Sequence, residues 1–127
     1  MASQAIEAKD EHWLTAARRV ARRIRSETRD TPGAAHHVYV VLLEGCSTAE
    51  GDDGLYVGQS YYSPEERFRQ HKAGHRASRI VKRCGVRLLP KLYQHLNPLA
   101  QAEALEIEAR LANAFKEAGL PNVRGGH

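Results

Sequence analysis

The sequence has no long apolar run and only two cysteines. No stretch stays apolar over the roughly 20 residues that a bilayer-spanning helix needs, so we expect no membrane-spanning segment and no membrane partner. The first residues, MASQAIEAKDEHW, lack the basic-then-apolar order of a signal peptide, and we expect a cytoplasmic protein. Cys46 and Cys84 lack a CxxC spacing, which argues against a zinc site and predicts free thiols.

Acidic residues are absent from one long internal segment. From Arg67 to Lys91 the chain carries nine Lys or Arg and no Asp or Glu, although the net charge of the whole chain is only +4. A block of one sign inside a folded region makes a positive surface, and phosphate is its commonest partner. The alternative is that the block is an ordinary solvated basic surface.

The chain also lacks internal repeats and low-complexity tracts, and its 127 residues suffice for one core. Hydrophobic periodicity and turn signals predict helices over 10–28, 63–74, 77–83 and 98–118, and strands over 37–44, 55–60 and 86–93. Ser63 is the expected N-cap of the second helix, with Glu66 as its reciprocal partner, and Gly74 is its expected end. Pro90 places the third strand at an edge or a bulge.

This order of elements predicts an α+β fold with a small three-stranded, mainly antiparallel sheet flanked by helices. Residues 1–35 form an extra N-terminal basic amphipathic helix and a linker, and residues 36–127 form the main domain. The first helix has an apolar stripe and many arginines, which leaves two interpretations. We favour packing of the stripe on the main domain, with phosphate contact as an addition.

One glutamate of the last predicted helix lies on its apolar face. At 100° per residue, Glu108 is surrounded by Ala104, Leu105, Leu111 and Ala112, whereas the neighbouring glutamates fall on the polar face. A carboxylate that faces a core must be paired, hydrogen-bonded or bound to a metal. Two interpretations are open, an ion pair with a basic residue such as Arg67 or a ligand for Mg²⁺.

Four further residues have side chains suited to phosphate chemistry. Arg67 and His71 are spaced i, i+4 and therefore share a helix face; arginine binds phosphate bidentately, and histidine can move a proton near neutral pH. Tyr39 and Tyr56 lie in the two strands of the predicted hairpin, which could place them on one sheet face. Each residue alone is also compatible with an ordinary surface or strand position.

Taken together, these residues resemble the GIY-YIG nuclease family. HVY (37–39) and YVG (56–58) correspond to the two name motifs, and RFRQH supplies Arg67 and His71. Glu108 in EALEIEARLA matches the metal-ligand Glu of the family, and Asn122 in GLPNVRGG matches its late Asn. The resemblance covers residues 37–122. His37 replaces the first Gly, Val replaces Ile in both motifs, and the loop between the motifs is longer than is usual in the family.

The resemblance implies a metal-dependent endonuclease that hydrolyses DNA phosphodiester bonds with a single Mg²⁺ or Mn²⁺. It implies that Glu108 holds the metal, Arg67 neutralises charge on the phosphate, and Tyr39 takes a proton from water with the help of His71. Tyr56 would orient the water or phosphate, and Asn122 would hydrogen-bond near the metal or backbone. Gln59 would lie at the rim of the site, and flanking phosphates would be held by Lys72, Arg76, Arg79, Lys82 and Arg83.

DNA is the expected partner, and RNA is not excluded because phosphate chemistry looks alike in both. One domain has one active site, so a double-strand cut would require a homodimer or two successive nicks. The alternative function is a non-catalytic nucleic-acid-binding module on the same fold.

Overall fold

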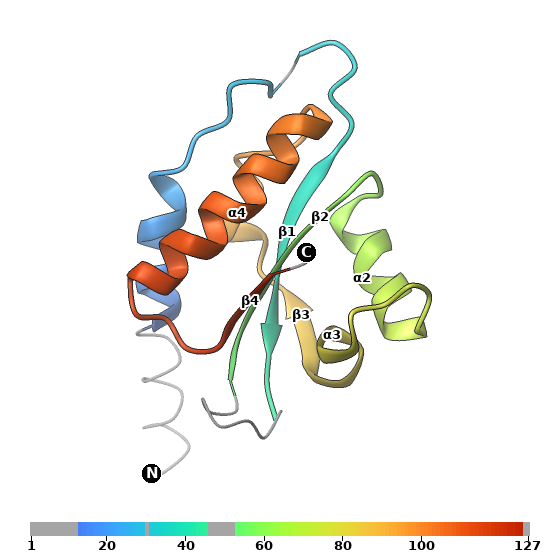
Figure 1. Ribbon diagram of the computed structural model, residues 1–127, viewed down its shortest axis with the longest axis vertical. Coiled ribbons are helices and arrows are strands. Elements are labelled where there is room, and N and C mark those ends of the chain that lie inside the picture. The colour runs from blue at the N-terminus through green and yellow to red at the C-terminus, as the bar shows by residue number, and fades with distance from the viewer. Residues whose placement is uncertain (1–12, 30, 46–52, 126–127) are drawn as a thin grey trace.

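The computed structural model describes residues 13–29, 31–45 and 53–125 (Figure 1). In chain order the elements are a helix over 13–22, β1 (His37–Leu43), β2 (Gly54–Ser60), α2 (Pro64–Ala73), α3 (Arg79–Cys84), β3 (Gly85–Leu88), the 3₁₀ turn η1 (Pro90–Leu92), α4 (Gln101–Glu117) and β4 (Val123–Gly125). Among these residues, no helix is both long enough and apolar enough to cross a membrane.

The four strands form one mixed sheet in the order β3-β1-β2-β4. β1 is antiparallel to β2 and to β3, whereas β4 is parallel to β2. The α+β prediction is confirmed, but the prediction of three strands is wrong. Three residues are too short for a period-2 pattern to reveal β4 in the sequence. The predicted third strand, 86–93, ends at Leu88 because Pro90 begins η1.

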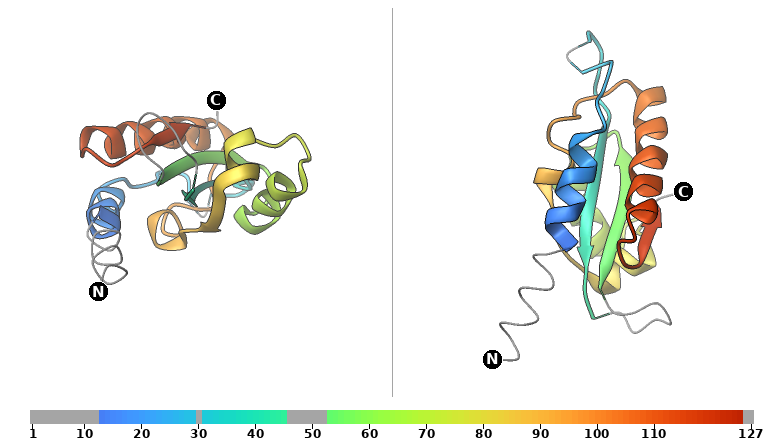
Figure 2. Two further views of the ribbon diagram at one scale, coloured as in Figure 1. Left: turned by 90° about the horizontal axis from the view of Figure 1, so that it is seen from below. Right: turned by 90° about the vertical axis from the view of Figure 1, so that its left-hand side faces the viewer.

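The sheet is covered on both sides. Figure 2 shows α4 on one side and the N-terminal helix on the other, while α2 and α3 lie together at the opposite flank from the N-terminal helix. Ala17, Ala21 and Ile24 belong to the same buried core as the strands. The apolar stripe of the first helix therefore packs on the body of the protein, as predicted. The boundary between residues 35 and 36 stays a prediction.

Two polar side chains fix the end of the N-terminal helix. His95 Nε2 lies 3.1 Å from the carbonyl oxygens of both Ala21 and Ile24, so this nitrogen carries the ring proton and donates it. The carboxylate of Glu103, in the first turn of α4, accepts from the backbone N–H groups of Glu27 at 2.7 Å and Thr28 at 2.9 Å. The end of the N-terminal helix is thus held by His95, which follows η1, and the residues after the helix are held by Glu103 of α4.

The ends of α2 are those predicted. Ser63 Oγ accepts from Glu66 N at 3.2 Å, Pro64 opens the helix, and Gly74 closes it with φ +86°. The carboxylate of Glu66 accepts two hydrogen bonds from Arg69, the nearer at 2.6 Å, instead of reaching back to the cap. In α4 the buried face runs through Ala104, Ile107, Glu108, Leu111, Ala112 and Phe115. Leu105, which we predicted to be buried, is 49% exposed.

Cys84, the last residue of α3, is disulfide-bonded. The prediction of free thiols is therefore wrong for Cys84. Cys46 lies outside the described residues.

Candidate active site

Two tyrosines share one face of the sheet. Tyr39 pairs with Gly58 and Val41 pairs with Tyr56, so strand alternation places Tyr39 and Tyr56 on the same face. Their ring centroids are 6.2 Å apart. A Cβ added to Gly58 would lie 2.5 Å from both Cζ and Oη of Tyr39. Glycine is required at position 58 because the phenol ring of Tyr39 lies across it.

His71 of α2 connects Tyr39 to the turn before α3. Its Nε2 lies 2.8 Å from Tyr39 Oη, and the backbone N–H of Ser78 donates to its Nδ1 at 2.9 Å. A backbone amide can only donate, so Nδ1 is the acceptor and the proton of the neutral ring is on Nε2. His71 therefore donates to the Tyr39 oxygen. In this state it does not draw a proton from Tyr39, which differs from the assistance that the resemblance implied.

Burial keeps these three rings uncharged. It lowers the pKa of His71 to about 4, with a smaller contribution from the positive charge of Arg67. Burial also raises the pKa of Tyr39 far above its ordinary value of 10, and the neighbouring Tyr56 adds to this. The pKa of Tyr56 is raised as well, mainly by burial, but hydrogen bonds from Ser78 and Tyr39 oppose the rise. The phenolate form is thus better supported at Tyr56 than at Tyr39.

Arg67 is held by the turn that follows α2. Its Nη1 donates to Gln70 Oε1 at 3.0 Å and to the carbonyl of His75 at 3.3 Å, and its Nη2 donates to the carbonyl of Arg76 at 2.8 Å. These bonds use three of its five N–H donors. The hydrogen bonds described for Arg67 all run to Gln70 and the turn after α2, and an ion pair of Arg67 with Glu108 stays a prediction.

Glu108 faces inward, as its helical position predicts, and is only 3% exposed. Its negative charge raises the pKa of both Tyr39 and Tyr56, so the carboxylate is electrostatically coupled to the two rings. The residues that the structure describes contain no group of three or more His, Cys, Asp or Glu side chains that could hold a metal. A metal prediction therefore rests on one carboxylate.

These elements enclose a cavity of about 320 Å³, which we call the cleft. Its lining consists of Tyr56, Arg67, His71, Arg76, Ala77, Ser78 and Gly125. β2, α2, the turn before α3 and β4 each supply part of the wall. Tyr39, in contrast, is 1% exposed and lies behind this lining, in contact with His71.

Asn122 directly precedes β4 and lies beside the first residues of β2. Its backbone has φ +44°, its carbonyl accepts from Leu55 N at 3.3 Å, and its Oδ1 accepts from Arg124 Nε at 2.8 Å. A Cβ on Gly54 would collide with the carbonyl oxygen of Asn122. These contacts give Asn122 a structural role in the turn into β4; no described contact joins it to Tyr39, Tyr56 or His71.

The residues predicted to bind flanking phosphates have different environments. Lys72 Nζ donates to the carbonyls of Lys82 and Gly85, both at 2.9 Å, and so holds the end of α3. Arg76 lines the cleft. Arg79, Lys82 and Arg83 are exposed on α3, and Gln59 is half-buried on β2.

Sequence reasoning missed Ser78 and β4. Ser78 Oγ caps α3 by accepting from Val81 N at 3.4 Å, and a serine just before RIVKR is the signal that could have marked it. Arg124 of β4 pairs with Tyr56 in the parallel register, and Gly125 completes the cleft wall.

No protein-family model matches the chain, and no curated protein or solved structure matches it either. The membership of the GIY-YIG family stays a prediction from the residues.

Proposed function

We propose that the protein is a metal-dependent endonuclease that hydrolyses DNA phosphodiester bonds in the cleft. The observation that carries the proposal is the convergence of Tyr56, Arg67 and His71 on one cavity, with Tyr39 and Glu108 coupled to it. Phosphodiester hydrolysis needs a proton acceptor for water and a positive clamp on the phosphate, and these side chains can supply both.

Glu108 is the residue that would hold Mg²⁺ or Mn²⁺. Magnesium prefers oxygen ligands and is often bound by only one or two carboxylates together with waters and substrate phosphates, so a single buried carboxylate fits it. When bound there, the metal would supply positive charge that eases departure of the leaving oxygen.

The cations of the cleft have a direct role toward phosphate. Arg67 retains two N–H donors beyond those it uses to hold the turn, and the fixed guanidinium suits the non-bridging oxygens of a phosphodiester. Arg76 contributes a second positive charge to the same cavity.

We assign the acceptance of the water proton to Tyr56 instead of Tyr39. Tyr56 lines the cleft, and its oxygen receives hydrogen bonds from Ser78 and Tyr39 that favour the phenolate. Tyr39 is buried and would act through Tyr56, while His71 fixes Tyr39 by donating to its oxygen. Tyr39 and His71 are thus positioning residues in this proposal.

The second candidate is a nucleic-acid-binding module that does not cut. The raised pKa values of both tyrosines favour it, because a neutral tyrosine is a poor proton acceptor near pH 7.

RNA is the alternative ligand for both candidate functions. A homodimer is proposed only for double-strand cutting. A cytoplasmic location stays a prediction. The disulfide bond of Cys84 does not favour it, because disulfides are more typical of oxidising compartments.

The test is a supercoiled-plasmid assay with Mg²⁺, with Mn²⁺ and with a chelator. We expect conversion to nicked plasmid that requires metal and that falls at least about 100-fold in Glu108→Gln. Glu106→Gln is the matched control, because Glu106 is exposed on the same helix and should cut like the wild type. No conversion by the wild type, with plasmid still retarded on a gel, would establish the binding module. Equal cutting by wild type and Glu108→Gln would refute the assigned metal ligand.

A further inference from the structure

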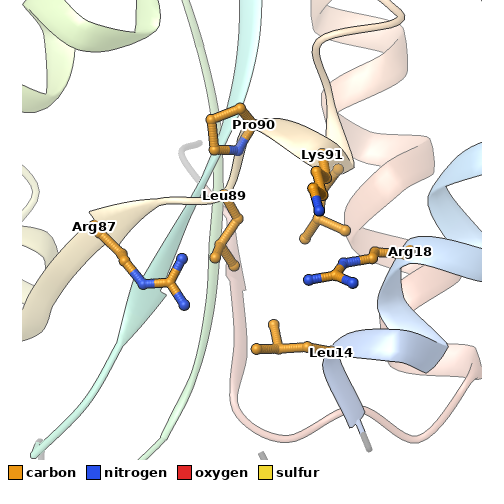
Figure 3. A pocket seen from close by; sticks show the side chains of 7 residues that line it. Leu14, Arg18, Arg87, Leu89, Pro90 and Lys91 are labelled. Atoms are coloured by element: carbon orange, nitrogen blue, oxygen red, sulfur yellow. The ribbon is translucent and has the colours of Figure 1, made fainter. Parts of the chain in front are cut away.

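A second concave surface lies between the N-terminal helix and the segment from β3 to η1, away from the cleft. Its main cavity has a volume of about 230 Å³, and Figure 3 shows Arg18, Arg87 and Lys91 around it. An adjacent cavity of about 360 Å³ shares Arg18 and Lys91 and adds Arg22. We call the surface made by Arg18, Arg22, Arg87 and Lys91 the basic groove.

The four cations come from two walls that are distant in the sequence. Arg18 and Arg22 are one turn apart on the N-terminal helix, so they lie on one helix face. Arg87 is in β3 and Lys91 in η1, on the facing wall. Figure 3 shows the side chains of Arg18 and Arg87 pointing from opposite walls toward the space between them, with Leu14 and Leu89 there.

None of the described residues that line the basic groove is an aspartate or a glutamate. The one salt bridge among the described residues joins Arg69 and Glu66, which lie elsewhere. Like charges that converge over apolar side chains repel one another, and a concave surface with a low-dielectric floor concentrates their field. A bound anion would relieve this repulsion.

The walls of the basic groove are held in place by hydrogen bonds. His95 donates to the carbonyls of Ala21 and Ile24, which joins the end of the N-terminal helix to the segment after η1. Leu89 N donates to the carbonyl of Val40 at 2.9 Å, which joins the other wall to β1. A site whose walls are already fixed loses little conformational freedom on binding.

We propose that the basic groove binds backbone phosphates of a nucleic-acid strand, as a second contact outside the cleft. The identity of the ligand rests on the proposed function, since the cleft is assigned to a phosphodiester. Arginine recognises phosphate through its planar fork of donors, and three of the four cations are arginines. The apolar surface of Leu14 and Leu89 suits the sugar between successive phosphates.

The experiment measures binding of a fluorescently labelled DNA duplex by anisotropy, in chelator, over a series of KCl concentrations. The test variant is Arg18→Gln with Arg87→Gln and Lys91→Gln, because glutamine keeps part of the aliphatic contact with the floor. The control variant is Arg19→Gln with Arg25→Gln and Lys116→Gln. These three residues are exposed, lie outside the basic groove and lower the net charge by the same amount.

For the test variant we expect a shallower line of log affinity against log salt. The magnitude of its negative slope should decrease by about 2 to 3, since each lost phosphate contact removes about 0.9. The control variant should change the slope by less than about 1. Equal changes in both variants, or none in the test variant, would overturn the proposal. Thermal melting by circular dichroism checks that both are folded; if the test variant is not, Arg87→Gln alone should lower the slope by about 0.9.

Two further measurements identify the ligand and separate this inference from the proposed function. Vesicles containing phosphatidylserine that bind the wild type but not the test variant, with DNA binding unchanged, would reassign the basic groove to membranes. Nicking by the control variant at saturating DNA should equal that of the wild type. A failed plasmid assay with the expected salt slopes would refute the nuclease alone, and normal nicking with unchanged slopes would refute the basic groove alone.

Discussion

The cleft and the basic groove both carry arginines, but the two regions hold them differently. In the cleft, Arg67 donates to the side chain of Gln70 and to two backbone carbonyls, and His71 is bonded at both ring nitrogens. In the basic groove the hydrogen bonds fix the walls, while Arg18 and Lys91 project from them without a described ion-pair partner. In the cleft, hydrogen bonds hold the side chains themselves. In the basic groove, hydrogen bonds hold only the backbone segments that carry the cationic side chains.

Under the proposed function, we expect the two regions to have different tasks. Proton transfer requires groups at fixed distances, and the hydrogen bonds of His71 in the cleft supply such distances. Phosphate contact requires positive charge within reach, and long side chains on rigid walls supply it. We therefore expect substitutions in the cleft to change cleavage and stability, and those in the basic groove to change salt dependence. The largest effects are expected at the tyrosines of the cleft.

The two tyrosines should differ in their effect on cleavage. Tyr56→Phe removes the hydroxyl that lines the cleft, and we expect the nicking rate to fall by about 10² to 10⁴. Tyr39→Phe should cut faster than Tyr56→Phe and instead lose about 1–3 kcal/mol of stability, because the buried Nε2–H of His71 loses its acceptor. Single-turnover nicking and urea unfolding measure the two effects. A larger loss of cleavage in Tyr39→Phe would return the proton acceptor to Tyr39.

Gly58→Ala should destabilise the fold by about 3 kcal/mol, because the new Cβ would lie 2.5 Å from the Tyr39 ring. Gln59→Ala, on the opposite face of β2, should cost less than about 1 kcal/mol. Urea unfolding of the two variants provides the comparison. A loss below about 1 kcal/mol in Gly58→Ala would mean that the Tyr39 ring moves freely, and the cleft would then not be fixed.

The burial of His71 predicts that the protein loses stability in acid. Its pKa is about 4 in the folded protein and 6.5 in the unfolded chain, so the unfolded state binds a proton first as the pH falls. The free energy of unfolding should therefore fall by up to about 2 kcal/mol from pH 7 to pH 5, and this fall should be absent in His71→Gln. Denaturation at both pH values measures it. The same fall in His71→Gln would assign it to other groups.

Lys72 and Arg83 both belong to the segment from Arg67 to Lys91 that lacks acidic residues. Lys72 is hydrogen-bonded to backbone carbonyls, whereas Arg83 is exposed. Lys72→Met removes the ammonium that bonds the carbonyls at the end of α3 and should cost about 1 kcal/mol. Arg83→Met removes an exposed charge and should leave the stability within about 0.5 kcal/mol of the wild type. If the salt dependence of DNA binding changes more in Lys72→Met than in Arg83→Met, Lys72 contacts phosphate after all.

Asn122→Gly should have the smallest effect. Glycine adopts φ +44° without strain but loses the hydrogen bond that Asn122 Oδ1 accepts from Arg124, so we expect a stability loss of no more than about 1 kcal/mol and a wild-type nicking rate. The plasmid assay tests this expectation directly. A fall in nicking with unchanged stability would bring Asn122 into the catalytic machinery, as the family resemblance implied.

The sequence was informative where one element suffices to place a residue. Helical periodicity alone predicted that Glu108 faces inward, and the i, i+4 spacing alone predicted that Arg67 and His71 share one helix face. It was uninformative where a site depends on contacts between distant segments. Which ring nitrogen of His71 carries the proton depends on the backbone amide of Ser78 across a turn. The position of Arg18 opposite Arg87 depends on how the first helix packs on the sheet. β4 has no periodic pattern because it is only three residues long.

The hydrogen bonds from His95 to the end of the N-terminal helix have a geometric consequence. They tie the end of the first helix to the segment after η1, so we expect the spacing between the cleft and the basic groove to stay fixed. One nucleic acid bound to both would be cut at a constant number of nucleotides from the strand held in the basic groove. The protein would then measure length along its substrate, as a ruler does, without reading a single base.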